Sequence, residues 1–75
     1  MDTHAGDYVV IIEPAANGSF SAYVPDLPGC VACGDTRAEA ETLIAEAVVL
    51  HVASLRKHGD PVPPPTSTAT RVRAA

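Results

Sequence analysis

One long helix, bracketed by start and stop signals, most constrains the fold of this chain. Thr36 is a favourable N-cap residue, and Glu39 three positions later completes a capping box. Gly59 stands at the expected C-cap position, after a last turn that carries cations. These signals predict a helix from Arg37 to about His58. Its apolar inner face would be formed by Ala40, Leu43, Ile44, Ala47, Val48, His51 and Leu55.

Two strands joined by a hairpin turn are predicted before this helix. Residues 8–12 are dense in β-branched side chains and stop short of Pro14, which favours a strand. Residues 19–24 alternate, so that Phe20 and every second residue after it share one face. The Asn-Gly pair at positions 17–18 is typical of the tight turn between such strands. Which residues of the first strand share the Phe20 face stays open.

A short third strand, over Cys30–Cys33 and followed by Gly34, is predicted after a second turn. Pro28 sets the backbone angle that a type II turn needs at its second position. Gly29 accepts the positive φ that the same turn needs at its third position.

The chain after the helix begins with a proline-rich connector over residues 60–65. Residues 66–72 alternate Thr and Ser with Ala and Val, which predicts a last strand at an edge. The order is then β-β-β-α-β, an α+β fold with a mostly antiparallel sheet and one long helix on one face. We expect a flexible N-terminus over residues 1–7, one domain over 8–72 and a short tail over 73–75.

The second face of such a sheet would be left uncovered. With 75 residues, one Phe, two Tyr and no Trp, the chain has little material for a core and is expected to need a partner. An exposed apolar sheet face is a candidate interface. We therefore expect a homodimer or tetramer whose contacts include Tyr8, Val10, Ile12 and Tyr23.

The charge balance favours a basic partner. The net charge is -4 at pH 7 and the pI is about 5.0, which argues against nucleic acid binding. The longest continuous apolar run has five residues, far short of a membrane span. The first seven residues carry no Lys or Arg, unlike a secretory signal. We expect a cytoplasmic protein that does not contact membranes.

The side chains that could carry chemistry do not form a convincing site. Cys30 and Cys33 lie three positions apart on a predicted strand, so their thiols would face opposite sides of the sheet. Two buried, reduced thiols are expected instead of a zinc or redox site. A two-metal site needs carboxylates that converge from strand centres, and Glu13 at a strand end does not meet that need. We expect no metal, no cofactor and no catalysis.

Several motifs together resemble the HicB antitoxin family. They are Pro25–Cys30 (PDLPGC), Gly34–Thr36 (GDT), Glu39-Ala40 and the Gly59–Pro65 connector. Within them, Pro28, Gly29, Gly34, Thr36 and Glu39 are the expected structural residues. The resemblance runs from about Tyr8 to Val72 and implies a partial ribonuclease-H-like fold, with a fourth strand parallel to the first.

The resemblance implies an antitoxin that sequesters a small, basic, mRNA-cleaving toxin of the HicA type. Family members usually add a C-terminal DNA-binding domain. This chain is expected to be a short form without that domain, so no direct DNA binding is expected. The alternatives are a stand-alone oligomeric module with a regulatory or scaffolding role, and a ribonuclease-H-like nuclease.

Overall fold

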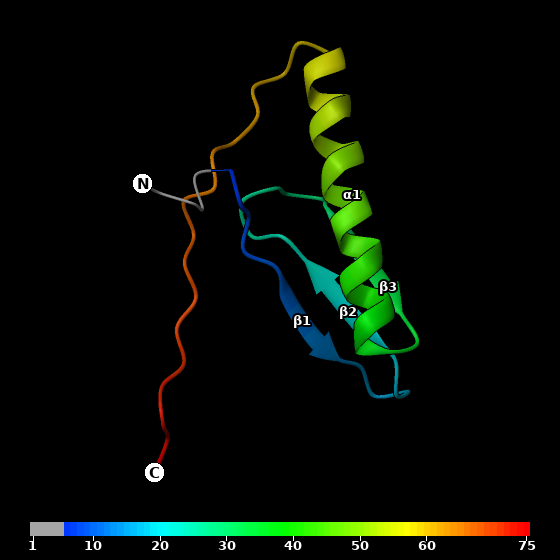
Figure 1. Ribbon diagram of the computed structural model, residues 1–75, viewed down its shortest axis with the longest axis vertical. Helices are drawn as coiled ribbons and strands as arrows, with labels where there is room; N and C mark the ends of the chain where they lie inside the picture. The colour runs from blue at the N-terminus through cyan, green and yellow to red at the C-terminus, as the bar shows by residue number, and fades with distance from the viewer. Residues whose placement is uncertain (1–5) are drawn as a thin grey trace.

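A computed structural model describes residues 6–75 as a small antiparallel sheet with one long helix across it (Figure 1). The strands are β1 (Ile11–Pro14), β2 (Phe20–Tyr23) and β3 (Val31–Gly34), in the order β1-β2-β3. The helix α1 spans Arg37–Lys57. The predicted α+β class is therefore confirmed. The expected flexible N-terminus lies largely outside the described residues, and the domain boundaries stay a prediction.

The first strand begins later than its composition predicts. Only Ile11–Pro14 pairs with β2, whereas the expected strand covered residues 8–12. The partner ends at Tyr23, and the Val24 N–H is donated to the Cys30 carbonyl at 3.2 Å. The next residue, Pro25, has no N–H to continue a ladder. Residues before Ile11 therefore have no strand to pair with.

The register of β1 on β2 decides which side chains face the helix. Ile12 pairs with Ala22, and Pro14 pairs with Phe20. Ala22 is almost fully buried in the core, and neighbours in one register row share a face. The even-numbered residues of β1 therefore lie on the helix side of the sheet. Pro14 is tolerated because β1 is an edge strand.

The loop between β2 and β3 contains the predicted turn. The Cys30 N–H is donated to the Leu27 carbonyl at 3.0 Å, which closes a four-residue turn around Pro28 and Gly29. Gly29 has φ +85°, the left-handed value that the third position of a type II turn requires. Leu27 itself points inward and is fully buried. The loop thus supplies part of the core.

Gly29→Val is expected to lower the melting temperature clearly. A β-branched side chain at φ +85° is strained and should cost about 1 kcal/mol or more. Gly29→Asn, whose side chain tolerates the left-handed region better, should cost less. Thermal denaturation followed by circular dichroism checks both variants. A valine variant that melts with the wild type would contradict the turn assignment.

The start of α1 carries the predicted cap. The Thr36 hydroxyl accepts a hydrogen bond from the Glu39 N–H at 3.1 Å. The Glu39 carboxylate accepts the Asp35 N–H at 2.7 Å, one residue before the position that a standard capping box uses. Two N–H groups at the helix entrance are therefore satisfied by side chains.

The helix ends as its stop signals predict. The last helical residue is Lys57, one residue before the expected end. The Gly59 N–H is donated to the Arg56 carbonyl at 3.1 Å, and the Asp60 N–H to the Leu55 carbonyl at 2.9 Å. This pair of bonds is a Schellman motif.

A small core lies between α1 and the sheet. The helix packs mainly over β3 and β2 and covers β1 least. Gly34 at the end of β3 lies against the first turn of α1, where the backbone of Ala40 approaches it closely. The buried core residues are Ala22, Val24, Leu27, Cys30, Ala40 and Ile44.

The predicted fourth strand does not form. Residues 60–75 carry no strand, and the chain beyond the helix runs back along the β1 side of the molecule without entering the sheet (Figure 1). The Tyr8 hydroxyl donates to the Pro63 carbonyl, and Asp26 holds Thr66 and Ser67. Residues 69–71 line a hollow beside residues 10–12 without pairing with them, so the alternating pattern of this segment forms no strand. The fourth strand of the ribonuclease-H-like arrangement is therefore not seen in residues 6–75.

Candidate functional site

The side of the sheet turned away from α1 presents an apolar row. Ile11, Tyr23 and Val31 pair with one another across the three strands, so their side chains share a face. Tyr23 is exposed, and Val31 is 65% exposed. The next row is formed by Glu13, Ser21 and Cys33. We call these six residues the open sheet face.

The structure divides the four predicted interface residues between surfaces. Tyr23 lies on the open sheet face, as the alternation in β2 predicts. Val10 and Ile12 instead pack against the core on the helix side, and Tyr8 contacts the proline connector. The β1 register sends even and odd residues to opposite faces, so the four residues do not form one sheet face, and their role in an interface stays a prediction.

Two members of the open sheet face were missed by sequence reasoning. Ile11 and Val31 flank Tyr23 in its register row. Val31 could have been found from the predicted third strand, since it alternates with the inward-facing Ala32. Ile11 could not, because its face depends on the register across the five-residue connection between β1 and β2.

The sheet half of the molecule is uniformly acidic. Residues 6–36 contain four acidic residues and no Lys, Arg or His. On the open sheet face the charged residue is Glu13, which is exposed at the end of β1. The first cation after this half is Arg37, and its guanidinium pairs with Glu41 at 3.0 Å on the helix. Residues 6–36 thus carry a net charge of -4, which favours a basic partner, and Arg37 and Arg71 line a hollow at the β1 edge.

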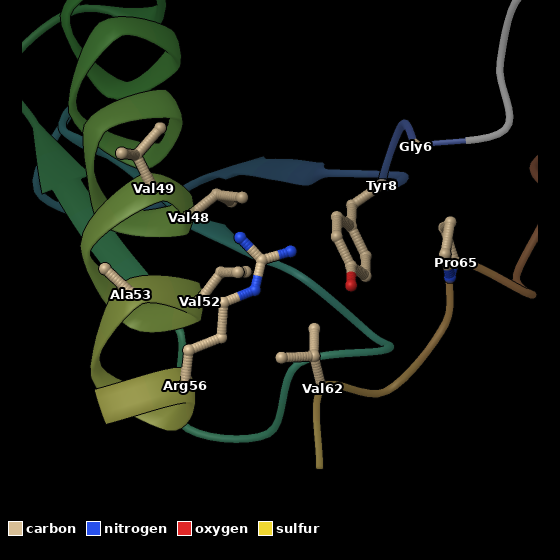
Figure 2. Close-up of a pocket in the computed structure, with 9 residues that line it drawn as sticks. All are labelled: Gly6, Tyr8, Val48, Val49, Val52, Ala53, Arg56, Val62 and Pro65. Carbon is tan, nitrogen blue, oxygen red and sulfur yellow. The ribbon is translucent and has the colours of Figure 1, made fainter. Parts of the chain in front are cut away.

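A hollow lies between the C-terminal half of α1 and the chain that returns from the end of this helix. Its volume is about 440 Å³, and Val48, Val52 and Val62 give it mainly apolar walls. Figure 2 shows the Arg56 side chain extending from the helix toward Tyr8. With one guanidinium and no carboxylate, imidazole or thiol in its lining, this hollow offers shape and apolar contact and no acid–base pair.

The side chains that could ligate a metal are dispersed. Within residues 6–75 no three His, Cys, Asp or Glu side chains come together in a group that could hold an ion. His51 is half-buried on α1, and the His58 ring nitrogen Nδ1 lies 2.8 Å from the Ser54 carbonyl at the helix end. In the same described range, no helix combines the length and hydropathy that crossing a membrane requires.

The two thiols occupy opposite environments, as their spacing predicts. Cys30 is buried in the core, and burial raises the pKa of its thiol. Cys33 is free and exposed on the open sheet face. The expectation that both thiols are buried is therefore wrong for Cys33, because it stands on the uncovered side of β3.

This difference predicts that one thiol per chain reacts rapidly with a water-soluble disulfide reagent. Reactivity follows access and thiolate content, and both are low for Cys30. Cys33→Ser should remove the rapid phase, while Cys30→Ser should leave it unchanged. Absorbance of the released thiolate in native protein checks this. Equal rates for both thiols would contradict the placement of Cys30 in the core.

Asp26 fastens the end of the proline connector to the loop between β2 and β3. Its carboxylate accepts the Ser67 N–H and hydroxyl, each at 2.8 Å, and the Thr66 N–H at 3.0 Å. These bonds, above all the one from the Ser67 backbone, lower the pKa of Asp26 below its ordinary 3.8. The anchoring is therefore complete above the ordinary pKa and is lost as the pH falls through the lowered one.

Asp26→Ala is expected to release residues 66 and 67 at neutral pH. Their amide protons should exchange with solvent much faster than in the wild type, because both lose their acceptor. The wild type should approach the behaviour of the variant only in acid, below the lowered pKa of Asp26. Hydrogen exchange followed by nuclear magnetic resonance checks both. Slow exchange of these amides in the variant would contradict the anchor.

The sequence of this chain matches a known protein family and several known proteins. A family described as the HicB-like antitoxin of bacterial toxin–antitoxin systems matches residues 8–75. A UPF0150 protein of Thermoplasma acidophilum is 41% identical over 56 residues, which are 75% of this chain and 81% of that protein. A UPF0150 protein of Synechocystis is 40% identical over 57 residues, 76% of this chain and 72% of that protein.

A longer phage protein is also similar to this chain. An uncharacterized 14.9 kDa protein from the rep-hol intergenic region of Haemophilus phage HP1 is 34% identical over 56 residues. The match covers 75% of this chain and 41% of the phage protein. Since the family match extends over nearly the whole described chain, this protein belongs to the HicB-like antitoxins of bacterial toxin–antitoxin systems.

Proposed function

We propose that this chain neutralises a small, basic, mRNA-cleaving toxin of the HicA type by binding it. The observation that carries the proposal is the antitoxin family match over residues 8–75. An antitoxin family implies a toxin partner and suggests a binding role in place of catalysis. The net charge of -4 supports a partner of opposite charge.

The open sheet face is the surface that we assign to this partner. It combines an exposed aromatic side chain, Tyr23, with exposed Val31, and aromatic anchors carry much of the binding energy at interfaces. It belongs to the half of the chain, residues 6–36, that has four acidic residues and no cation. A basic partner would thus approach along a favourable field and bury an apolar centre.

Co-expression with the small basic protein encoded by a neighbouring gene tests the function. The wild type should rescue growth from that protein and copurify with it. Recovery of the two proteins in separate fractions under mild conditions would overturn the proposal.

Two exposed valines offer a matched test of the surface. Val31→Asp places a charge in the apolar row and should weaken toxin binding at least about tenfold, a loss of roughly 1.4 kcal/mol. Val72→Asp makes the same change at an exposed position in the C-terminal segment and should bind like the wild type. Titration calorimetry measures both. Equal affinities would remove the open sheet face as the binding surface.

A further inference from the structure

The outward side of α1 carries apolar side chains that the fold leaves uncovered. Ala40 and Ile44 point into the core, whereas Val49 and Leu50 are 68% and 70% exposed. Leu43, expected on the inner face, is also exposed. This apolar surface is unusual for a helix that already has one face against a sheet.

Leu43 and Leu50, unlike Val49, belong to a line of exposed residues whose spacing suits contact with another helix. Leu43, Glu46, Leu50, Ala53 and Lys57 succeed one another at intervals of three, four, three and four residues. That is the 3.5-residue period of the contact seam in paired helices. We call these five residues the outer stripe.

The charges of α1 are divided between its two ends. Its acidic residues are Glu39, Glu41 and Glu46, all in the first half, where the cation Arg37 pairs with Glu41, and its last turn carries Arg56 and Lys57. A second copy of α1 lying antiparallel would place its basic end beside the acidic half of the first. A parallel copy would place like charges together. The charges of α1 are therefore complementary to those of a second α1 helix in the antiparallel orientation.

One register satisfies both the apolar and the charged members of the outer stripe. If the two-fold axis passes beside Leu50, that residue meets its own copy, and Glu46 lies within one residue, about 1.5 Å, of the level of the small Ala53 of the other chain. Leu43 then lies level with the other Lys57, whose aliphatic stem can cover it. The backbone of that Lys57 lies about 4.5 Å along the helix axis from the backbone of Glu46, so its ammonium group can reach the Glu46 carboxylate.

We propose that two copies of this chain pair through the outer stripes of their α1 helices, in antiparallel orientation about a two-fold axis near Leu50. The small core favours such an association, because Leu27 is its largest fully buried side chain and a chain of 75 residues has little else to stabilise it. A basic toxin is a poorer occupant, since it would meet Arg56 and Lys57 at one end of this surface. The pairing does not depend on the proposed function.

Two matched aspartate variants locate the contact. Leu50 and Val31 are similarly exposed, on the helix and on the open sheet face respectively. In light scattering at micromolar concentration, the wild type should have at least twice the 7.7 kDa chain mass. Leu50→Asp should halve the wild-type mass, and Val31→Asp should leave it unchanged. A monomeric wild type, or dissociation by Val31→Asp in place of Leu50→Asp, would overturn the proposal.

A charge exchange tests the antiparallel direction and guards against an unfolded Leu50 variant. Glu46→Lys and Lys57→Glu each create a like-charge contact across the pair, so each alone should dissociate more readily than the wild type. Mixed together, they should form a heterodimer in which both contacts are attractive. Native mass spectrometry of the purified chains without any toxin reads this out. Unchanged association of each variant alone, or no gain on mixing, would overturn the antiparallel pairing.

Discussion

Gly34→Ala is expected to lower the free energy of unfolding by about 3 kcal/mol, because the site has no room for one more carbon. An ideal Cβ on Gly34 would lie 2.6 Å from the Ala40 backbone nitrogen and 3.0 Å from the Glu39 carbonyl carbon. Both atoms belong to the capped first turn of α1, so relief requires the helix to move off β3 as a body. The end of a flexible side chain could move away from the added carbon, but these backbone atoms are fixed by the helix.

Urea denaturation of the wild type and the Gly34→Ala variant measures this difference in the free energy of unfolding. Gly6→Ala is the matched control, since nothing lies within 4 Å of a Cβ at Gly6. We expect the control to unfold with the wild type and the Gly34 variant to unfold at much lower urea. Equal midpoints for all three proteins would show that α1 does not seat on Gly34 as described.

Leu27→Ala is expected to cost about 3 kcal/mol, through lost burial and the cavity left behind. Leu27 is the largest fully buried side chain, and its carbonyl also closes the turn to Cys30. A chain of this length has a total stability of about 4–11 kcal/mol, so the variant should lose much of it. Since the alanine keeps the backbone bond, the loss reports packing alone.

Leu27→Met separates the loss of side-chain volume from a change of side-chain shape at this site. The methionine conserves volume and should cost less than about 1.5 kcal/mol. Thermal denaturation followed by circular dichroism compares the two variants. A methionine variant as unstable as the alanine variant would mean that the loop between β2 and β3 tolerates no change of shape there.

Local chemistry explains which parts of the fold were predictable from sequence. The cap at Thr36 and Glu39 and the turn at Pro28 and Gly29 depend on residues within four positions of each other. Such features need no knowledge of the rest of the chain. For the same reason the helix was predicted within one residue of its observed end.

The failures all concern contacts between distant segments. Residues 8–10, whose side chains are typical of strands, are unpaired because β2 stops before Pro25. Residues 69–71 lie beside Ile11 and Ile12 without joining the sheet, while Asp26 holds Thr66 and Ser67. Strand propensity depends on the side chains of a segment and does not tell whether another strand is available to pair with it. The face of Ile12 was likewise left open by the sequence, since it follows from the pairing of Ile12 with Ala22, and the interface role of these residues stays a prediction.

The helix is much longer than the sheet beneath it. Its 21 residues extend about 31 Å, whereas four-residue strands span about 13 Å. Its two buried side chains, Ala40 and Ile44, lie in the first half. The later turns rest on half-buried valines and on the returning chain.

The later turns of α1 can therefore open without disturbing the strands, as a unit of lower local stability than the core. Opening from Lys57 toward the middle of the helix would uncover Val52 and Leu55, which pack against the core, while Gly34 stays in contact with the first turn. A partner that binds to the exposed side of those turns would suppress this fraying. Binding at the exposed side of α1 would then reduce the motion of these turns and change the shape of the molecule little.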